Sequence, residues 1–364
     1  MLSNIKEYFQ KKNEIQSFSS ILKPGNYSPP LFSKGSVYIN KGVILPHHLN
    51  QTKLNRKIEL NNFYGFWKWI FFFILDLYVF LFVRFNINND NKLNYQIAIK
   101  TNQDDYVFMD GENNKVMRVL HKNIDMNEYV VKRKKFEKYI NSISFEIKSL
   151  ESNQIIEPFI HGIYFLNLSN ENIIFHIKNL LKSYANYTKK ESQSQNNFVV
   201  SNKKIIIDLI ENTELPEYII NELKNYNFVN KINEIKYIAS HTDLSHRNLM
   251  YYNEKLLVID FPDIRLFPIF YDPFSIFCLG KSDIYELFLK KIFNKELFSI
   301  LSSESNYNKK FELQILENMA LFCIYHAYRK ITQKNEENID KALFKKIVIR
   351  GWTKWYLTLK SNFI

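Results

Sequence analysis

The chain has 364 residues and a formal net charge of +12, so it is long enough for two lobes, each with its own core. The excess of basic side chains indicates an anionic partner, such as a nucleotide, a membrane surface or a nucleic acid. No clustered basic run with interleaved glycine occurs, so we expect no nucleic acid partner. Cys278 and Cys323 stand alone and far apart, which argues against a zinc site and a disulfide framework and fits a reducing compartment.

The N-terminal residues lack the continuous apolar core of a signal peptide. A short amphipathic helix is expected from Ile5 to Phe18, and the prolines and glycines of Lys23–Pro46 predict an irregular, extended segment. We therefore expect a cytoplasmic protein in which residues 1–90 form an N-terminal extension.

An aromatic and apolar segment, Phe63–Phe85, contains only three charged residues, Lys68, Asp76 and Arg84. Its length suits a membrane-spanning helix, but Asp76 near its middle costs about 3 kcal/mol on insertion scales. Three placements stay open: a helix buried between lobes, a helix lying in a membrane surface, and a true span. The second placement would bring the protein to the inner face of the cell membrane.

The pattern changes to short alternating runs after residue 94. These runs predict a strand meander at Tyr95–Lys100, Tyr106–Asp110 and Lys115–Leu120, followed by a helix over Asn127–Ile143. Further helices are expected at Asn170–Lys190, Glu214–Tyr226, Ser282–Leu301, Lys309–Thr332 and Glu336–Leu359. The prediction is an α+β fold with a small antiparallel-sheet lobe over residues 91–160 and a larger helical lobe over residues 161–364.

The residues best suited to chemistry lie between Ile235 and Asp263. Two apolar runs there, Ile235–Ala239 and Leu256–Ile259, flank a polar loop and a hairpin turn at Asn253-Glu254. The loop holds His241, Asp243, Leu244 and Asn248, and Asp260-Phe261 follows the second run.

These residue types fit phosphoryl transfer, which needs an oriented hydroxyl and cations that neutralise the phosphate oxygens. Asp243 can accept or aim the proton of the attacking hydroxyl. Asn248 and Asp260 offer one amide oxygen and one carboxylate, which suffice for a Mg²⁺ that also binds phosphates. We expect His241 to hold the loop by hydrogen bonds rather than to transfer a proton.

The spacing resembles the protein kinases, in which H-R-D-L-x-x-x-N precedes a strand ending in D-F-G. It resembles more closely the aminoglycoside and choline kinase branch of the protein-kinase-like fold, whose motifs read H-G-D-L and I-D-F or I-D-W. Phe267-Pro268 and Tyr271-Asp272-Pro273 also look like that branch. The resemblance implies a two-lobed kinase-like fold with ATP and Mg²⁺ as cofactors.

The same resemblance implies a set of nucleotide-binding residues. Arg118 takes the place of the strand lysine that reaches the α/β-phosphates, although an arginine there is longer and planar. Glu137, with Glu128 in reserve, corresponds to the helix glutamate that pairs with that lysine. Glu157 and Phe159 lie in a segment that resembles the hinge, where backbone groups near Phe159 would meet the adenine.

The predicted function is an ATP- and Mg²⁺-dependent phosphotransferase acting on a hydroxyl of a small molecule or of a glycan or lipopolysaccharide precursor. The alternative is a pseudokinase-like nucleotide-binding or scaffold protein, suggested by Arg118 and by the lack of a G-x-G-x-x-G loop. A protein kinase is less favoured because no A-P-E follows Asp260. His246 and Arg247 either bind an anionic acceptor or face solvent.

Overall fold

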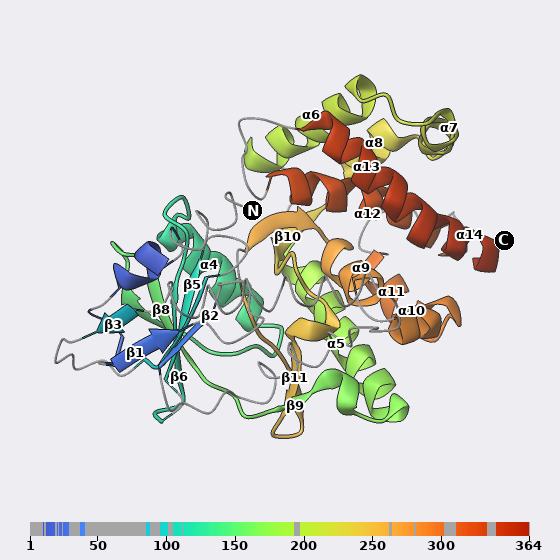
Figure 1. The fold of residues 1–364 in the computed structure, drawn as a ribbon. Coiled ribbons are helices and arrows are strands. Elements are labelled where there is room, and N and C mark those ends of the chain that lie inside the picture. The colour runs from blue at the N-terminus through green and yellow to red at the C-terminus, as the bar shows by residue number, and fades with distance from the viewer. Residues whose placement is uncertain are drawn as a thin grey trace, which may run out of the picture. The chain divides into compact units, whose positions relative to one another are not determined.

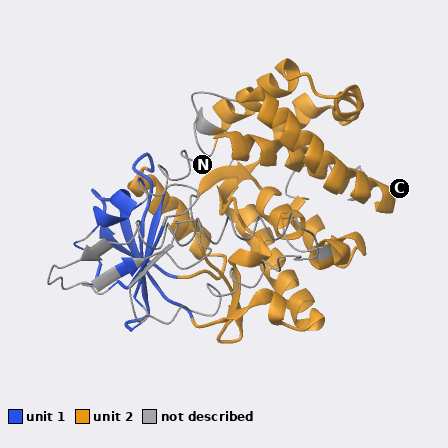
Figure 2. Cartoon of the chain, in the orientation of Figure 1, with its two compact units in different colours: residues 1–124, 144–160 blue, residues 125–143, 161–364 orange. Residues whose placement is uncertain are grey.

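The computed structural model describes residues 10, 12–18, 20, 22–23, 25–28, 37–40, 85–87, 95–100, 105–110, 112–192, 197–261, 264–279, 282–301, 311–332 and 340–363. The chain divides into two units (Figure 2): Met1–Ile124 with Ser144–Ile160 form unit 1, and Asp125–Ile143 with His161–Ile364 form unit 2. We expected boundaries after residues 90 and 160. The structure places the N-terminal strands in unit 1 and the helix that begins after Asp125 in unit 2; the division into three functional parts stays a prediction.

Unit 1 is built on an eight-stranded antiparallel sheet with the strand order β3-β1-β2-β4-β5-β6-β8-β7 (Figure 1). The strands are β1 (Gly25–Ser28), β2 (Val37–Asn40), β3 (Phe85–Ile87), β4 (Ile97–Lys100), β5 (Tyr106–Asp110), β6 (Lys115–Val119), β7 (Glu146–Ser149) and β8 (Gln154–Pro158). The expected meander is confirmed, since β4, β5 and β6 pair in succession. Asp110 shapes the β5–β6 turn, because its Oδ1 accepts the amides of Glu112 and Asn113.

The N-terminal part of the chain joins this sheet instead of remaining irregular. Strand β1 pairs with β2 and β3, and β2 pairs with β4. Residues 12–16 are helical, within the helix expected from Ile5 to Phe18. The aromatic segment Phe63–Phe85 lies outside the described residues except for Phe85, which begins β3.

The core of unit 1 joins the N-terminal residues to the meander. Phe18 packs against Tyr106 and Phe108, with ring centroids 4.8 and 5.2 Å apart. The buried members of this core are Ile15, Leu22, Tyr27, Tyr95, Ala98, Phe108, Met117 and Val119.

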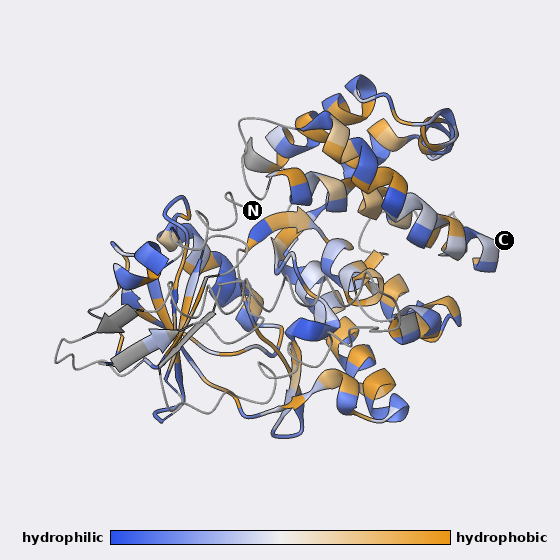
Figure 3. Ribbon diagram, viewed as in Figure 1, coloured by the Kyte–Doolittle hydropathy of each residue, from blue (hydrophilic) through white to orange (hydrophobic). Residues whose placement is uncertain are grey.

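Unit 2 is mainly helical. Its α-helices are α4 (Met126–Glu137), α5 (Asn170–Glu191), α6 (Asn197–Asn212), α7 (Glu217–Asn225), α8 (Phe228–Glu234), α9 (Tyr271–Cys278), α10 (Ser282–Leu289), α11 (Asn294–Leu301), α12 (Phe311–Thr332), α13 (Lys341–Gly351) and α14 (Leu357–Phe363). Figure 3 shows hydrophilic and hydrophobic residues interspersed along these helices, as expected for helices with one packed face. The predicted fold class, a small antiparallel-sheet part and a larger helical part, is confirmed.

Local sequence explains several helix ends. The side chains of Asp125, Ser169 and Asp340 cap the first turns of α4, α5 and α13 by accepting backbone amides. The helix expected over Glu336–Leu359 is observed as α13, a π-helical segment η3 (Trp352–Tyr356) and α14. Helix α6 was not predicted.

Short strands of unit 2 carry the loops that concern function. Strand β10 (Tyr237–Ser240) pairs with β13 (Arg265–Pro268), and β11 (Leu249–Tyr252) pairs with β12 (Lys255–Val258) and β9 (Ile163–Tyr164). Within the described residues, no helix has the length and apolar character needed to cross a membrane.

Candidate active site

The hairpin β11–β12 brings two of the predicted site residues together. Leu249 lies opposite Val258 in the ladder, and the Ile259 amide donates a hydrogen bond to the Asn248 carbonyl oxygen at 3.0 Å. Asp260 follows directly on the chain. The register of one hairpin therefore places Asn248 beside Ile259, the residue that precedes Asp260.

Asn248 also contacts the third predicted residue. Its Nδ2 donates a hydrogen bond to the backbone oxygen of Asp243 at 2.7 Å. This contact uses the amide nitrogen, so the side-chain Oδ1 is the atom that could bind a cation. Asp260 has a φ of 58°, a left-handed conformation that is rare for a residue with a Cβ and typical of functional sites.

His241, at the start of this loop, has a fully buried side chain. Its Nε2 lies 3.0 Å from the carbonyl oxygen of Ile259, and its Nδ1 accepts the amide of Asp243 at 3.3 Å. Burial is the main reason why the pKa of His241 falls to about 4. A neutral imidazole with Nε2 protonated satisfies both contacts, and it ties the loop to the strand that precedes Asp260.

Asp272, at the start of α9, holds the same loop through hydrogen bonds to its backbone. Its carboxylate accepts the amides of His241 and Thr242 at 2.7 and 2.9 Å and the hydroxyl of Tyr184 at 2.9 Å. Burial raises the pKa of Asp272 to about 6, against the effect of these donors. The sequence shows Asp272 as part of a family-like motif, but no local pattern reveals that it binds a loop 30 residues earlier.

Arg329 of α12 is a second residue that the sequence analysis missed. Its Nη1 lies 3.3 Å from Oδ1 of Asp243. The Arg329 side chain is 4% exposed, whereas the Asp243 side chain is 38% exposed. In the sequence, Arg329 stands beside Lys330 in the last turn of α12, where basic residues are common, so no local signal distinguishes it.

Phe261, the aromatic residue after Asp260, is enclosed by α4. Its ring lies 4.6 Å from that of His241 and 5.5 Å from that of Phe136. The Arg133 guanidinium lies 4.3 Å from the centre of the same ring, and the Tyr129 hydroxyl donates to the Phe261 carbonyl oxygen at 3.2 Å. Helix α4 thus holds the backbone that leads away from Asp260.

The two acidic residues expected to reach Arg118 have partners on their own helix. Glu137 pairs with Arg133 at 3.1 Å, and Glu128 pairs with Lys132 at 2.7 Å. Arg118 itself belongs to unit 1. The predicted set therefore falls into two groups, one in each unit.

The predicted residues of unit 1 contact one another. Arg118 Nε lies 3.7 Å from Oε2 of Glu157, and both side chains are about 5% exposed or less. The ladder between β6 and β8 explains this pairing, because Val116 and Arg118 lie opposite Glu157 and Ile155. The amide of Phe159 donates to the Asn114 carbonyl oxygen at 2.7 Å, so this amide is already bonded within unit 1.

His246 and Arg247, the basic pair of the loop, differ in their exposure to solvent. His246 is buried, whereas Arg247 is exposed. Arg247 is close enough to Tyr164 to oppose the rise of the Tyr164 pKa that burial and Asp260 cause. Arg247 is therefore the member of the pair that solvent, or a solute, can reach.

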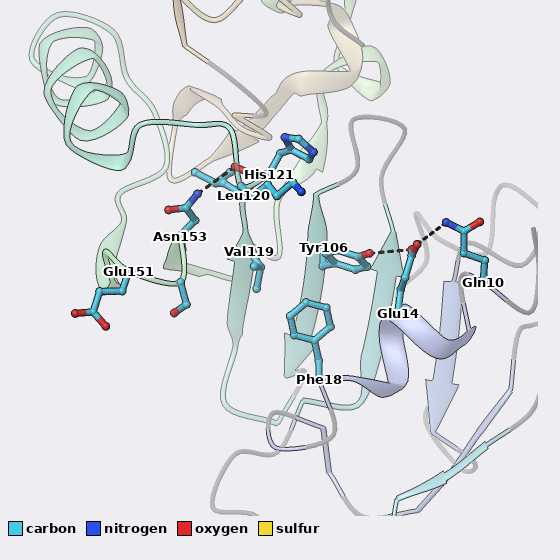
Figure 4. A pocket seen from close by; sticks show the side chains of 11 residues that line it. Gln10, Glu14, Phe18, Tyr106, Val119, Leu120, His121, Glu151 and Asn153 are labelled. Carbon is cyan, nitrogen blue, oxygen red and sulfur yellow. Dashed lines mark hydrogen bonds between the residues drawn. The ribbon is translucent and has the colours of Figure 1, made fainter. Parts of the chain in front are cut away.

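Unit 1 also contains a cavity of about 600 Å³ between the N-terminal helical residues, strands β5 and β6, and the β7–β8 turn (Figure 4). Glu14 in its wall accepts hydrogen bonds from Gln10 and from the Tyr106 hydroxyl, each at 2.9 Å. Asn153 donates to the backbone oxygen of His121 at 3.1 Å. None of the predicted site residues lines this cavity, so we assign it no part in the proposed chemistry.

Comparisons with known proteins give matches of structure only. No protein-family model and no curated protein matches the sequence. A choline/ethanolamine kinase family protein from Mesorhizobium loti matches with a TM-score of 0.44 and 11% identity, over 71% of this chain and 89% of the other. The choline kinase LicA from Streptococcus pneumoniae matches with a TM-score of 0.43 and 13% identity, over 70% and 90%.

An ethanolamine kinase from Plasmodium vivax matches with a TM-score of 0.44 and 14% identity, over 88% of this chain and 98% of the other. At these TM-scores the likeness carries no argument about activity, which we infer from the side chains of this chain. In structure, the chain is similar to a choline/ethanolamine kinase family protein, a choline kinase and an ethanolamine kinase.

Proposed function

We propose that the protein is a phosphotransferase that uses ATP and Mg²⁺ to phosphorylate a hydroxyl of a small molecule or of a glycan or lipopolysaccharide precursor. One observation carries this proposal. Asn248 bonds the backbone of Asp243 at 2.7 Å and the amide of Ile259 at 3.0 Å, and so joins the loop of Asp243 to the strand end of Asp260.

Asp243 is the residue that we propose contacts the acceptor, because its carboxylate is partly exposed while His241 is buried and neutral. In the transfer, the acceptor oxygen forms a bond to the γ-phosphorus and the bond from that phosphorus to the β,γ-bridging oxygen breaks. The hydroxyl proton passes to the Asp243 carboxylate, and ADP leaves with the electron pair of the broken bond. Asp243 mainly aims the hydroxyl, since a loose transition state asks little of a base.

Asn248 and Asp260 are the residues that would hold Mg²⁺. Within the described part of the chain, no cluster of three or more His, Cys, Asp or Glu side chains could hold a metal. One carboxylate and one amide oxygen nevertheless fit Mg²⁺, which keeps several waters and takes phosphate oxygens as ligands. When bound, the ion would neutralise the charge on the phosphate oxygens.

The nucleotide-binding roles of Arg118, Glu137, Glu157 and Phe159 remain predictions from the sequence. LicA, one of the similar structures, has been solved in complex with AMP, and we propose that this chain also binds an adenine nucleotide. The Phe159 amide is bonded to Asn114, so the proposed adenine contact would use other backbone groups near Phe159.

The proposal is tested by ATP turnover with and without Mg²⁺ against a panel of alcohols, including choline, ethanolamine, sugars and lipopolysaccharide-type glycans. Asp243→Asn should lower kcat about 100- to 10,000-fold and leave nucleotide affinity nearly unchanged. Asp260→Asn should also weaken Mg²⁺-nucleotide binding, as measured by calorimetry. Asp208→Asn, an exposed carboxylate of α6, is the matched control.

Equal and mild losses in the Asp243 and Asp260 variants would contradict these roles. Turnover that does not depend on Mg²⁺ would contradict the proposed metal-binding role of Asn248 and Asp260. No turnover with any acceptor would remove the transfer reaction itself.

The alternative, a pseudokinase-like protein with weak or no transfer activity, is favoured by one observation. Arg118 lies 3.7 Å from the buried Glu157 of the neighbouring strand β8, not from the helix glutamate that pairs with the lysine in kinases. This carboxylate offsets the positive charge that would attract a phosphate. Arg118→Lys tests it by titration with an ATP analogue. Higher nucleotide affinity in Arg118→Lys would show that Arg118 stands in for a kinase lysine. Unchanged affinity in a second variant, Arg118→Ala, would show that Arg118 binds no phosphate and would support the alternative.

A further inference from the structure

Arg329 is a buried cation whose charged partner lies outside its own helix. It is nearly buried at the end of α12, where a guanidinium is costly unless it is paired. Its Nη1 meets Oδ1 of Asp243 at 3.3 Å, and it also interacts with the hydroxyl of Tyr271. The buried cation is thus directed at the carboxylate that we place at the acceptor.

The backbone of Asp243 is held independently of Arg329. Its amide donates to His241 Nδ1 at 3.3 Å, and its carbonyl oxygen accepts from Asn248 Nδ2 at 2.7 Å. Two side-chain torsions are then the remaining freedom of this aspartate. A bond from Arg329 to Oδ1 restricts both of them and leaves Oδ2 for another partner.

We propose that Arg329 is a positioning residue for phosphoryl transfer, holding Oδ1 of Asp243 so that Oδ2 receives the acceptor hydroxyl. This inference rests on the proposed function, because it requires Asp243 to receive the acceptor hydroxyl. It assigns Arg329 itself no contact with acceptor or nucleotide. A planar guanidinium directs its donors better than an ammonium group, and small misplacements of a reacting group are expensive in rate.

The end of α12 is itself well anchored, as a positioning role requires. Tyr328 donates to Asn202 of α6 at 2.9 Å, and the Thr332 hydroxyl donates to the Tyr328 carbonyl oxygen at 2.9 Å. His326, one turn earlier, lies 3.2 Å from the Tyr271 hydroxyl. Residues on both sides of Arg329 are therefore fixed to the body of unit 2.

The test compares Arg329→Gln and Arg329→Lys with the unmodified chain and with Arg350→Gln, which removes an exposed arginine of α13. We expect Arg329→Gln to lower kcat about 10- to 100-fold. The KM for ATP and the affinity for the non-hydrolysable analogue AMP-PNP should stay within twofold. Arg329→Lys should recover part of the lost kcat, and Arg350→Gln should match the unmodified chain.

A double-mutant cycle with Asp243→Asn gives the decisive comparison. If Arg329 acts through Asp243, adding Arg329→Gln to Asp243→Asn should cause little further loss of kcat. Additive losses, or equal losses of kcat and AMP-PNP affinity, would overturn the inference while leaving the proposed function intact.

Two further outcomes remain distinguishable. If Arg329→Gln does not fold, Arg329→Lys decides, because an unchanged kcat there would show that the directed guanidinium is not needed. An unmodified chain without transfer to any alcohol of the panel would instead defeat the proposed function, and this inference with it.

Discussion

Three side chains determine the shape of the loop that contains Asp243. His241 bonds the strand end before Asp260, Asp272 binds two successive amides of the loop, and Arg329 contacts the Asp243 carboxylate. All three are buried. A buried polar group is costly unless its partners are in place, so each of these contacts constrains the loop.

Burial of histidines makes stability depend on pH. Burial lowers the pKa of His326 to about 3, below the usual value near 6.5. As the pH falls from about 6.5 towards 3, the unfolded chain binds a proton at this histidine that the folded chain does not bind, so the free energy of unfolding decreases. We expect His326→Gln to reduce this decrease, as measured by urea unfolding between pH 7 and pH 4.

The control variant for this measurement is His161→Gln, which removes an exposed histidine. Asp272 acts in the opposite direction, because its raised pKa means that the folded chain holds a proton between about pH 4 and pH 6. His241 adds to the effect of His326, so the net loss of stability on acidification remains. An unchanged pH slope in His326→Gln would contradict the prediction.

At the scale of elements, α4 holds the Asp260-Phe261 segment in place through contacts with Phe261. Arg133 is fully buried and contacts Glu137, the Tyr129 hydroxyl and the Ile143 carbonyl oxygen at 2.9 to 3.1 Å. We expect Arg133→Met to lower the free energy of unfolding by about 2–4 kcal/mol, because these partners lose their donor. Urea unfolding measures the change.

The exposed Lys134 of the same helix provides the matched control, Lys134→Met. Turnover should fall in the Arg133 variant beyond the loss of folded protein, since Phe261 loses the cation over its ring. A variant as stable as the Lys134 control would show that α4 does not hold this segment.

The β11–β12 hairpin has a turn that its sequence does not favour. Asn253 and Glu254 have φ values of 46° and 62°, and a two-residue turn with both φ positive prefers glycine at the second position. Glu254→Gly should therefore raise the free energy of unfolding by about 1 kcal/mol. Glu254→Ala keeps the Cβ and should give no such gain; equal stability of the two variants would rule out the strain.

At the scale of the whole molecule, the segment Phe63–Phe85 bears on where the protein works. It lies outside the described residues apart from Phe85, so the three placements that its sequence allows stay predictions, of which we test the helix in a membrane surface. Lys53, Arg56 and Lys57 precede it, and each basic residue near an anionic membrane adds about 1 kcal/mol of attraction. We expect the protein to sediment with anionic vesicles in low salt.

Replacing aromatic residues of this segment with charged residues should release the protein from vesicles without abolishing ATP binding. Neutral vesicles are the control for the electrostatic part of the attraction. A protein that stays in the supernatant with anionic vesicles in low salt would contradict the membrane prediction and favour an acceptor free in the cytosol.

The sequence alone determined the features that depend on neighbours in the chain. Alternating apolar and polar residues predicted strands β4 to β6, and helical periodicity predicted α5 and α12. A motif within one short stretch of the chain grouped Asp243, Asn248 and Asp260. These patterns act over one strand, one helix or one hairpin. Their geometry is set by hydrogen bonds between residues that are close in sequence.

Only the tertiary structure decided the pairings between distant segments. Arg329 reaches Asp243 across 86 residues, and the Asp272 bond to the His241 amide spans 31. Arg118 meets Glu157 because β8 pairs with β6 in one register, and the N-terminal strands join the sheet through β4. Such contacts follow from strand register and helix packing, which local periodicity does not encode.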